Sequence, residues 1–177
     1  MFRENNSHLQ FSILENTNWM NPGIKAKLEK SWAPIFYEHV FCNIDEKPFS
    51  VLYSDMGRPN FPVNILLSLE YIKHLKNYLN DELIENFYFN YLVNYAVGIR
   101  VLGKLNLAEK TLHDFRARVY RYLLEHPEQE DLIFGQFLKL TQSFAEKAGI
   151  STAQQRMDST NHVHVKHQKS RKACPGI

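Results

Sequence analysis

Apolar side chains recur about every three to four residues through most of this chain, and only helices bury such a pattern on one side. The spacing is clearest in residues 62–79 and 112–125, and glycines and prolines fall mostly between the periodic segments. In 112–125 the apolar stripe consists of Leu112, Phe115, Val119, Tyr122 and Leu123. The pattern predicts a mainly α fold, a multi-helix bundle of about six or seven helices.

The composition is that of a globular protein: 44% of the 177 residues are hydrophobic and 13% are aromatic. The length suits one domain or slightly more. Two isolated cysteines, Cys42 and Cys174, argue against a disulfide framework and favour a reducing compartment. No signal-peptide pattern opens the chain and no apolar run is long enough to cross a bilayer. We therefore expect a cytoplasmic protein without a membrane partner.

Turn residues and charge divide the chain into four parts. Residues 1–20 are expected to form an N-terminal arm and residues 21–150 a helical domain. Residues 151–160 contain the only predicted strand, at 154–158, and residues 161–177 form a basic tail that we expect to be disordered. Four residues of the tail would attract phosphates, namely Lys166, Lys169, Arg171 and Lys172.

Positive charge is concentrated in residues 98–121, which hold six basic and two acidic residues. Thr111 is expected to open an amphipathic helix here, with 81–97 as the supporting helix before it. A basic helix presented after a turn is typical of helix-turn-helix DNA-binding modules, although the loop 103–110 is longer than a tight turn. The sequence thus predicts a helix-turn-helix-like DNA-binding part. Its candidate contacts are Arg58, Lys110, His113, Arg116, Arg118 and Arg121.

Two alternatives stay open for the arginines of this helix. They could form a solvated face that serves solubility alone. Arg116 could instead belong to an internal ion pair with a neighbouring helix.

Asp158, at the end of the predicted strand, is the candidate catalytic and metal-binding residue. A carboxylate in that place could bind Mg²⁺ for phosphoryl transfer, in which two metal ions hold the attacking and leaving oxygens. Such a site needs about three acids from distant parts of a fold, and the other acids of this chain lie on predicted helices or caps. A turn or helix-cap role for Asp158 is the alternative.

Several motifs occur in a fixed order. They are Gly57-Arg58-Pro59-Asn60-Phe61-Pro62 before a long apolar helix, Asp81-Glu82-Leu83-Ile84, Thr111-Leu112-His113-Asp114-Phe115-Arg116, and Arg156-Met157-Asp158-Ser159-Thr160. This arrangement resembles the N-terminal domain of bacterial insertion-sequence DDE transposases of the InsH-like kind, followed by the first strand of their RNase H-like catalytic core.

The resemblance implies that the helical domain binds the terminal inverted repeats of a mobile element, as a homodimer on paired ends. It implies that Asp158 is the first acid of the catalytic triad and binds Mg²⁺ in an intact enzyme. The second Asp and the Glu of the triad do not follow in this sequence. We therefore expect a truncated fragment, catalytically inactive and without a cofactor of its own, in the bacterial cytoplasm and associated with the nucleoid when bound to DNA.

A protein of another class stays open: a helical protein-interaction module that dimerises with an intact transposase and inhibits it. The aromatic stretch 87–91 would supply its contact surface, unless those rings belong to the core.

Overall fold

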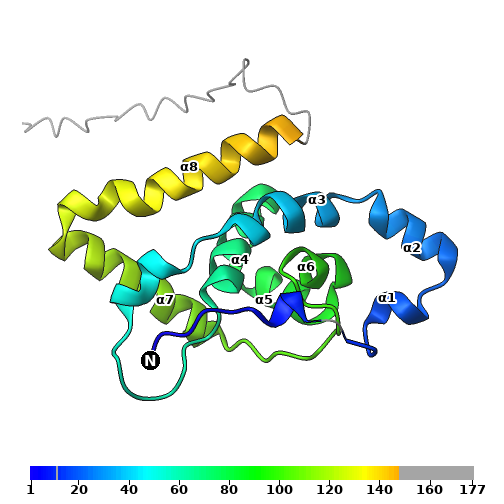
Figure 1. Ribbon diagram of the computed structural model, residues 1–177, viewed down its shortest axis with the longest axis horizontal. Coiled ribbons are helices and arrows are strands. Elements are labelled where there is room, and N and C mark those ends of the chain that lie inside the picture. Colours follow the sequence, from blue (N-terminus) through cyan, green and yellow to red (C-terminus); the bar gives the residue numbers. More distant parts are fainter. Residues whose placement is uncertain (11, 148–177) are drawn as a thin grey trace, which may run out of the picture.

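A computed structural model describes residues 1–10 and 12–147, and these form helices joined by loops (Figure 1). Within these two ranges no strand occurs, which confirms the mainly α fold and the helical bundle predicted from the sequence. The predicted strand 154–158, Asp158 and the tail 161–177 lie outside the described residues. The α-helices are α1 (Asn16–Trp19), α2 (Pro22–Glu29), α3 (Trp32–His39), α4 (Val63–Lys76), α5 (Asn80–Phe89), α6 (Tyr91–Ala96), α7 (Glu109–Glu125) and α8 (Glu130–Lys147). Short 3₁₀ helices are η1 (Ser7–Leu9), η2 (Phe41–Asn43), η3 (Lys47–Leu52) and η4 (Pro127–Gln129).

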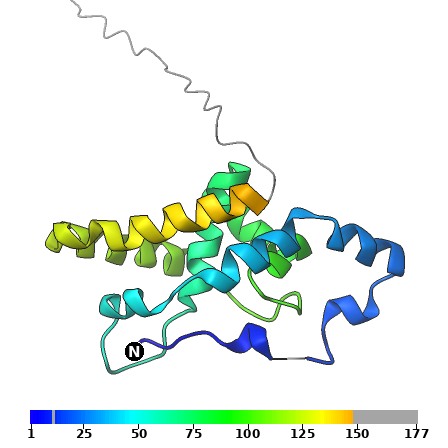
Figure 2. The ribbon, with the colours of Figure 1, turned by 45° about the horizontal axis from the view of Figure 1, so that its top comes forward.

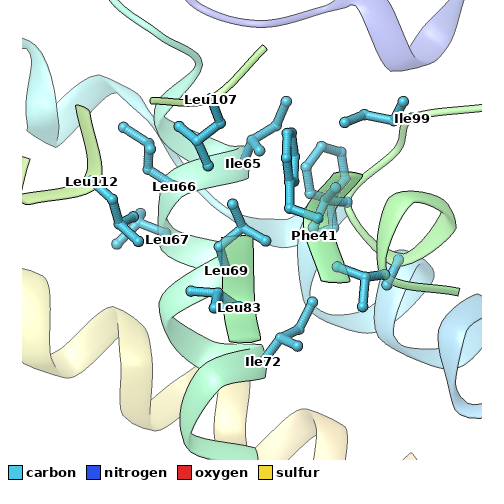
Figure 3. Close-up of a cluster of buried hydrophobic side chains, with 14 of the residues drawn as sticks. Phe41, Ile65, Leu66, Leu67, Leu69, Ile72, Leu83, Ile99, Leu107 and Leu112 are labelled. Atoms are coloured by element: carbon cyan, nitrogen blue, oxygen red, sulfur yellow. The ribbon is translucent and has the colours of Figure 1, made fainter. Parts of the chain in front are cut away.

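Helix α4 is the centre of the fold (Figure 3). Every residue from 63 to 69 is buried, and so is Ile72, which means that neighbours cover the helix on all sides. A helix that is apolar around most of its circumference is stable only inside a core. The cluster around α4 draws on α3, η2, α5 and α7 through Phe36, Phe41, Leu83 and Leu112.

The other helices lie around α4 in an elongated arrangement. Helix α3 packs on both α6 and α8. The ring of Tyr71 in α4 stacks on that of Phe137 in α8, with centroids 6.0 Å apart. In both views α7 and the start of α8 lie at one end of the long axis, α8 runs back towards the middle, and α1 and α2 lie at the other end (Figure 1, Figure 2).

Helices α1 and α2 stand outside the core. Residues 21–27 are all exposed, and Leu28 is the buried residue of α2. The indole of Trp19 in α1 is 78% exposed. Asn16 fastens this part to the body, because its N–H donates to the Arg100 carbonyl at 3.0 Å and its Oδ1 accepts from the Leu102 N–H at 3.1 Å.

The helix starts agree with the sequence in part. Asn21 caps α2 as expected, since its Oδ1 accepts from the Gly23 N–H at 2.9 Å. The basic helix, in contrast, begins at Glu109 rather than at Thr111. Its first turn is closed by the backbone: the Thr111 N–H donates to the Ala108 carbonyl at 2.8 Å. Thr111 therefore lies inside the helix and not at its cap.

The predicted supporting helix 81–97 is two helices. Helix α5 ends at Phe89, and Asn90 caps α6 by accepting the Leu92 N–H at 3.0 Å. Residues 97–108 then connect α6 to α7, which is more than the three or four residues of a tight helix-turn-helix.

The carboxylate of Glu46 joins three segments while only 7% exposed. Its Oε2 accepts from the N–H groups of Val63 and Asn64 at 3.1 Å each, and its Oε1 accepts from the Asn5 N–H at 2.8 Å. A negative charge at the start of a helix is favoured by the helix dipole. Burial raises the pKa of Glu46, whereas the three donors act in the opposite direction. The bonds close residues 46–63 into a loop and fix the N-terminal segment to it.

Gly98 lies where the chain leaves α6, with a φ of +76° that favours glycine. A Cβ built there would lie 2.7 Å from Cε1 of Phe41 and 2.9 Å from Cβ of His8. The ring of His8 also meets that of Phe41 edge-on, with centroids 5.0 Å apart. The N-terminal segment therefore packs so closely over Gly98 that no side chain fits.

Replacing Gly98 with alanine should lower the free energy of unfolding by roughly 2–4 kcal/mol, because backbone strain adds to the overlap with Phe41 and His8. Gly103 provides the matched control: its φ is +75°, yet nothing lies within 4 Å of an added Cβ. Gly103→Ala should cost about 1 kcal/mol from strain alone. Urea denaturation followed by circular dichroism compares the two. Equal losses would contradict the close packing over Gly98.

The stability of the protein should depend on pH through His8. Burial lowers the pKa of His8 below 6.5, and the charge of Arg100 adds to this effect, against a bond to the backbone of Asn5. As pH falls through about 6.5, the unfolded chain takes up a proton that folded His8 does not, so stability is lost towards acid. The midpoint of thermal unfolding should fall more steeply from about pH 7 to 5.5 in the unaltered protein than in His8→Phe. The exposed residue His74 gives the control, since His74→Gln should keep the steeper profile. Parallel profiles for His8→Phe and the unaltered protein would refute this.

Candidate nucleic-acid interface

A groove of about 420 Å³ lies between residues 52–61 and the first half of α7. It brings together two segments that are about fifty residues apart in the chain. Arg58 comes from the turn after η3, and Arg118 comes from α7. The other lining residues are Met1, Leu52, Tyr53, Ser54, Met56, Pro59, Asn60, Phe61, Leu66, Thr111, Asp114 and Phe115.

The wall of the groove that carries Arg58 is held at several points. Glu46 closes the loop at its base. Near its tip the Asn60 N–H donates to the Met1 carbonyl at 3.1 Å, and Asn60 Oδ1 accepts from the Arg3 N–H at 2.7 Å. Gly57, with a φ of +110°, allows the sharp turn before Arg58. Backbone bonds therefore fix the place of Arg58, while its side chain stays exposed.

Arg118 forms the opposite rim and rests on an aromatic ring. Its Cζ lies 5.2 Å from the ring centroid of Tyr53, within the range of a cation–π interaction. Burial raises the pKa of Tyr53, and the charge of Arg118 and its hydrogen bond to the phenol act against this. Tyr53 is therefore a neutral phenol at pH 7, and it orients a guanidinium that remains exposed to solvent.

Arg116 does not share this surface. Its Nε donates to Glu70 Oε1 of α4 at 2.6 Å, and its Nη1 donates to Asn80 Oδ1 at 3.1 Å. The side chains of Arg116 and Glu70 are 32% and 16% exposed, so the pair is partly buried. The structure thus has the internal ion pair that the sequence left open as an alternative. Residues two apart on a helix point to opposite sides, which separates Arg116 from Arg118.

Lys110 and His113 line a different groove, of about 520 Å³, between α5 and α7. Three carboxylates line it too, those of Asp81, Glu109 and Asp114. His113 Nδ1 lies 3.7 Å from Asp114 Oδ1. The second groove therefore carries charges of both signs, and it attracts an anion less strongly than the first groove does.

Arg121 is exposed one turn beyond Arg118, on the same side of α7. Among the described side chains it has no hydrogen-bond or ion-pair partner. Four of the six predicted contacts, Arg58, Lys110, Arg118 and Arg121, thus combine exposure with the lack of an ion-pair partner among the described side chains. Lys110 lies in the groove with three carboxylates, which leaves Arg58, Arg118 and Arg121 as the exposed cations outside that mixed groove.

Sequence reasoning missed the residues between the two arginines of the groove. The sequence predicts a turn at 57–62, which contains Phe61, and a capped segment at 46–53, which ends with Tyr53. Asp114 is predicted to belong to a variant capping box. Only the docking of α7 against η3 makes them neighbours, and no local spacing reports such a contact.

The described part of the chain contains no group of three His, Cys, Asp or Glu residues that could hold a metal ion. None of its helices is long and apolar enough to cross a membrane. Asp158 lies outside that part, so its predicted role in binding Mg²⁺ stays a prediction.

The described residues define a helical domain that presents two arginines across a groove. Residues 27–118, which make up more than half of the chain, match the family model of the Transposase domain (DUF772). The chain belongs to this family of transposase domains, so its role is related to transposition. The matched range runs from α2 into α7 and includes both walls of the groove. No curated protein and no solved structure matches the chain.

Removing the partner of Arg116 should weaken the fold rather than change its surface. Glu70→Gln leaves a partly buried guanidinium without its carboxylate and should cost about 1–3 kcal/mol of unfolding free energy. Arg116→Gln should cost a similar amount, and the double variant should cost less than the sum of both. Arg121→Gln is the control on the same helix and should change stability by under about 0.5 kcal/mol. Additive losses from Glu70 and Arg116 would contradict the pairing.

Proposed function

We propose that the helical domain of residues 21–150 binds DNA through a cationic surface made of Arg58, Arg118 and Arg121. The observation that carries the proposal is the pair of exposed guanidinium groups on opposite rims of one groove. Arginine forks suit phosphate oxygens. The fold fixes the backbone of Arg58 and rests the guanidinium of Arg118 on Tyr53, and neither arginine has an ion-pair partner among the described side chains. Membership of a transposase-domain family supports DNA as the partner.

The target that we propose is the terminal inverted repeat of a mobile element. This target, and the pairing of two copies on two DNA ends, rest on the resemblance to insertion-sequence transposases. So does the role of Asp158 as the first Mg²⁺-binding acid of an intact enzyme. Lys110 and His113 would add phosphate contacts at the edge of the same helix, weakened by the carboxylates beside them.

A second candidate function has one observation in its favour. In the aromatic stretch 87–91, the ring of Phe87 is buried, as expected of core, but Phe89 is 77% exposed. Phe89 lines a surface groove together with Tyr78 and Tyr91. An exposed aromatic patch of this kind suits a protein partner, including an intact transposase. The affinity for such a partner would depend only weakly on salt concentration.

Salt dependence separates the two functions. For a DNA duplex of about 20 base pairs, log Kd should rise steeply with the logarithm of the salt concentration. Changing Arg58, Arg118 or Arg121 to Gln should lower the slope of that plot by about 1 for each arginine removed. Lys27→Gln is the control, because this exposed lysine lies on α2 at the opposite end of the long axis (Figure 1). Fluorescence anisotropy over a range of salt concentrations gives the slopes. Binding that is weak at low salt, or slopes unchanged in the triple variant, would rule out this DNA surface.

A further inference from the structure

We infer that the groove between residues 52–61 and α7 holds one unpaired nucleotide of the bound DNA. Its phosphate lies between Arg58 and Arg118, and its base lies against the aromatic lining. This inference rests on the proposed DNA-binding function. It adds that the domain prefers DNA in which one base is unpaired and no longer stacked in the double helix.

The size of the groove fits such a ligand. At about 420 Å³ it falls within the range of small-molecule sites, roughly 300–1,000 Å³. A stacked base pair cannot enter a site of this kind, whereas a nucleotide turned out of the helix can, as in enzymes that flip bases.

Charge distinguishes this groove from two others of similar size. The groove beside Lys110 is lined by three carboxylates against Lys110, Arg116 and His113. The groove beside Phe89, of about 570 Å³, is lined by Glu82 and Glu85, with no cation among its described lining residues. The groove of Arg58 and Arg118 has a single carboxylate among its described lining residues, that of Asp114. It is therefore the one of the three whose lining is predominantly cationic and suits a phosphate.

The interior of the groove suits a nucleobase. Tyr53 and Phe61, both half-buried, contribute the accessible aromatic surface, and Leu52 adds apolar surface. Phe115 and Leu66, 4% and 1% exposed, lie beneath them as the floor. Aromatic side chains bind unstacked bases of any sequence through their faces. The exposed thioether of Met56, which is 84% accessible, lies at the edge and can cover a bound base from the solvent side.

The rim is arranged before any ligand arrives. Arg118 already rests on Tyr53, with its Cζ 5.2 Å from the ring centroid. The hydrogen bonds of the Asn60 N–H and of Asn60 Oδ1 to the N-terminal segment fix the turn that carries Arg58. A site that is already ordered loses less entropy when it binds. Asp114, 43% exposed, is the acceptor available to an amino group of the base. This favours guanine, adenine or cytosine over thymine, which has no amino group.

The test uses the full chain and two kinds of probe. The first probe is a DNA duplex of about 20 base pairs with one unpaired guanine at its centre, compared with the fully paired duplex and with a duplex that has an abasic site in place of that guanine. We expect the unpaired guanine to tighten binding about tenfold, and the abasic duplex to lose this gain. Arg58→Gln with Arg118→Gln should abolish the gain. Arg121→Gln, outside the groove, should weaken all three duplexes equally.

The second probe is 2′-deoxyguanosine 5′-monophosphate, followed by NMR of backbone amides. Shifts should concentrate in residues 53–61 and 111–118, and inorganic phosphate at the same concentration should produce much smaller ones. Equal shifts with inorganic phosphate would mean a simple anion site and would overturn the inference. Equal affinity for the fully paired duplex and the duplex with the unpaired guanine would also overturn the inference. If the salt slope still depended on Arg58 and Arg118, the proposed DNA-binding function would stand. Absence of duplex binding would overturn both.

Discussion

The buried carboxylate of Glu46 is the contact on which the positions of the groove and the core both depend. By accepting two N–H groups from the first turn of α4, it closes residues 46–63 into a loop. By accepting the Asn5 N–H, it holds the N-terminal segment against that loop. Without this closure, a surface loop of this length would be flexible, and Arg58 would lose many conformations when it binds a ligand. Because Glu46 makes the closure, one wall of the groove belongs to the same hydrogen-bonded unit as the central helix.

Helix α7 supplies the other wall, and its two sides have different tasks. On the inner side Arg116 pairs with Glu70 and anchors α7 to α4. On the outer side Arg118 faces the groove from a place that this anchor fixes. A binding group on a rigid helix is positioned more accurately than one on a loop. The family match covers α4, the loop and the first part of α7, so the elements that position the groove lie within the range that defines the family.

Much of the fold could be predicted from the sequence, because helical spacing and side-chain caps are local signals. Asn21 caps the expected helix, and the apolar stripe of 112–125 begins with the two buried residues of α7, Leu112 and Phe115, and continues with half-buried ones. The start of α7 was misplaced because a backbone carbonyl, rather than a side chain, closes its first turn. The separation of Arg116 from Arg118 was available in principle from their spacing alone, since two residues along a helix amount to a little more than half a turn.

The candidate site was harder to predict, for a physical reason. Four of the six residues chosen for DNA contact, Arg58, Lys110, Arg118 and Arg121, are exposed and have no ion-pair partner among the described side chains, and three of these four lie outside the groove lined by Asp81, Glu109 and Asp114. The groove itself depends on Tyr53 meeting α7 across a long stretch of chain. Contacts of this kind follow from how the core packs, and nothing in the composition or spacing of either segment encodes them individually.

The exposed position of α1 has a consequence for spectroscopy. The chain contains two tryptophans. Trp19 has most of its indole in water, whereas Trp32 packs edge-on against Phe36, with centroids 5.8 Å apart, and lies under the ammonium group of Lys76. Intrinsic emission therefore combines a red-shifted signal from the outlying helices with a second one from the margin of the core. The aromatic residues among the described lining of the groove between Arg58 and Arg118 are tyrosine and phenylalanine, so a ligand bound there would not contact either indole directly.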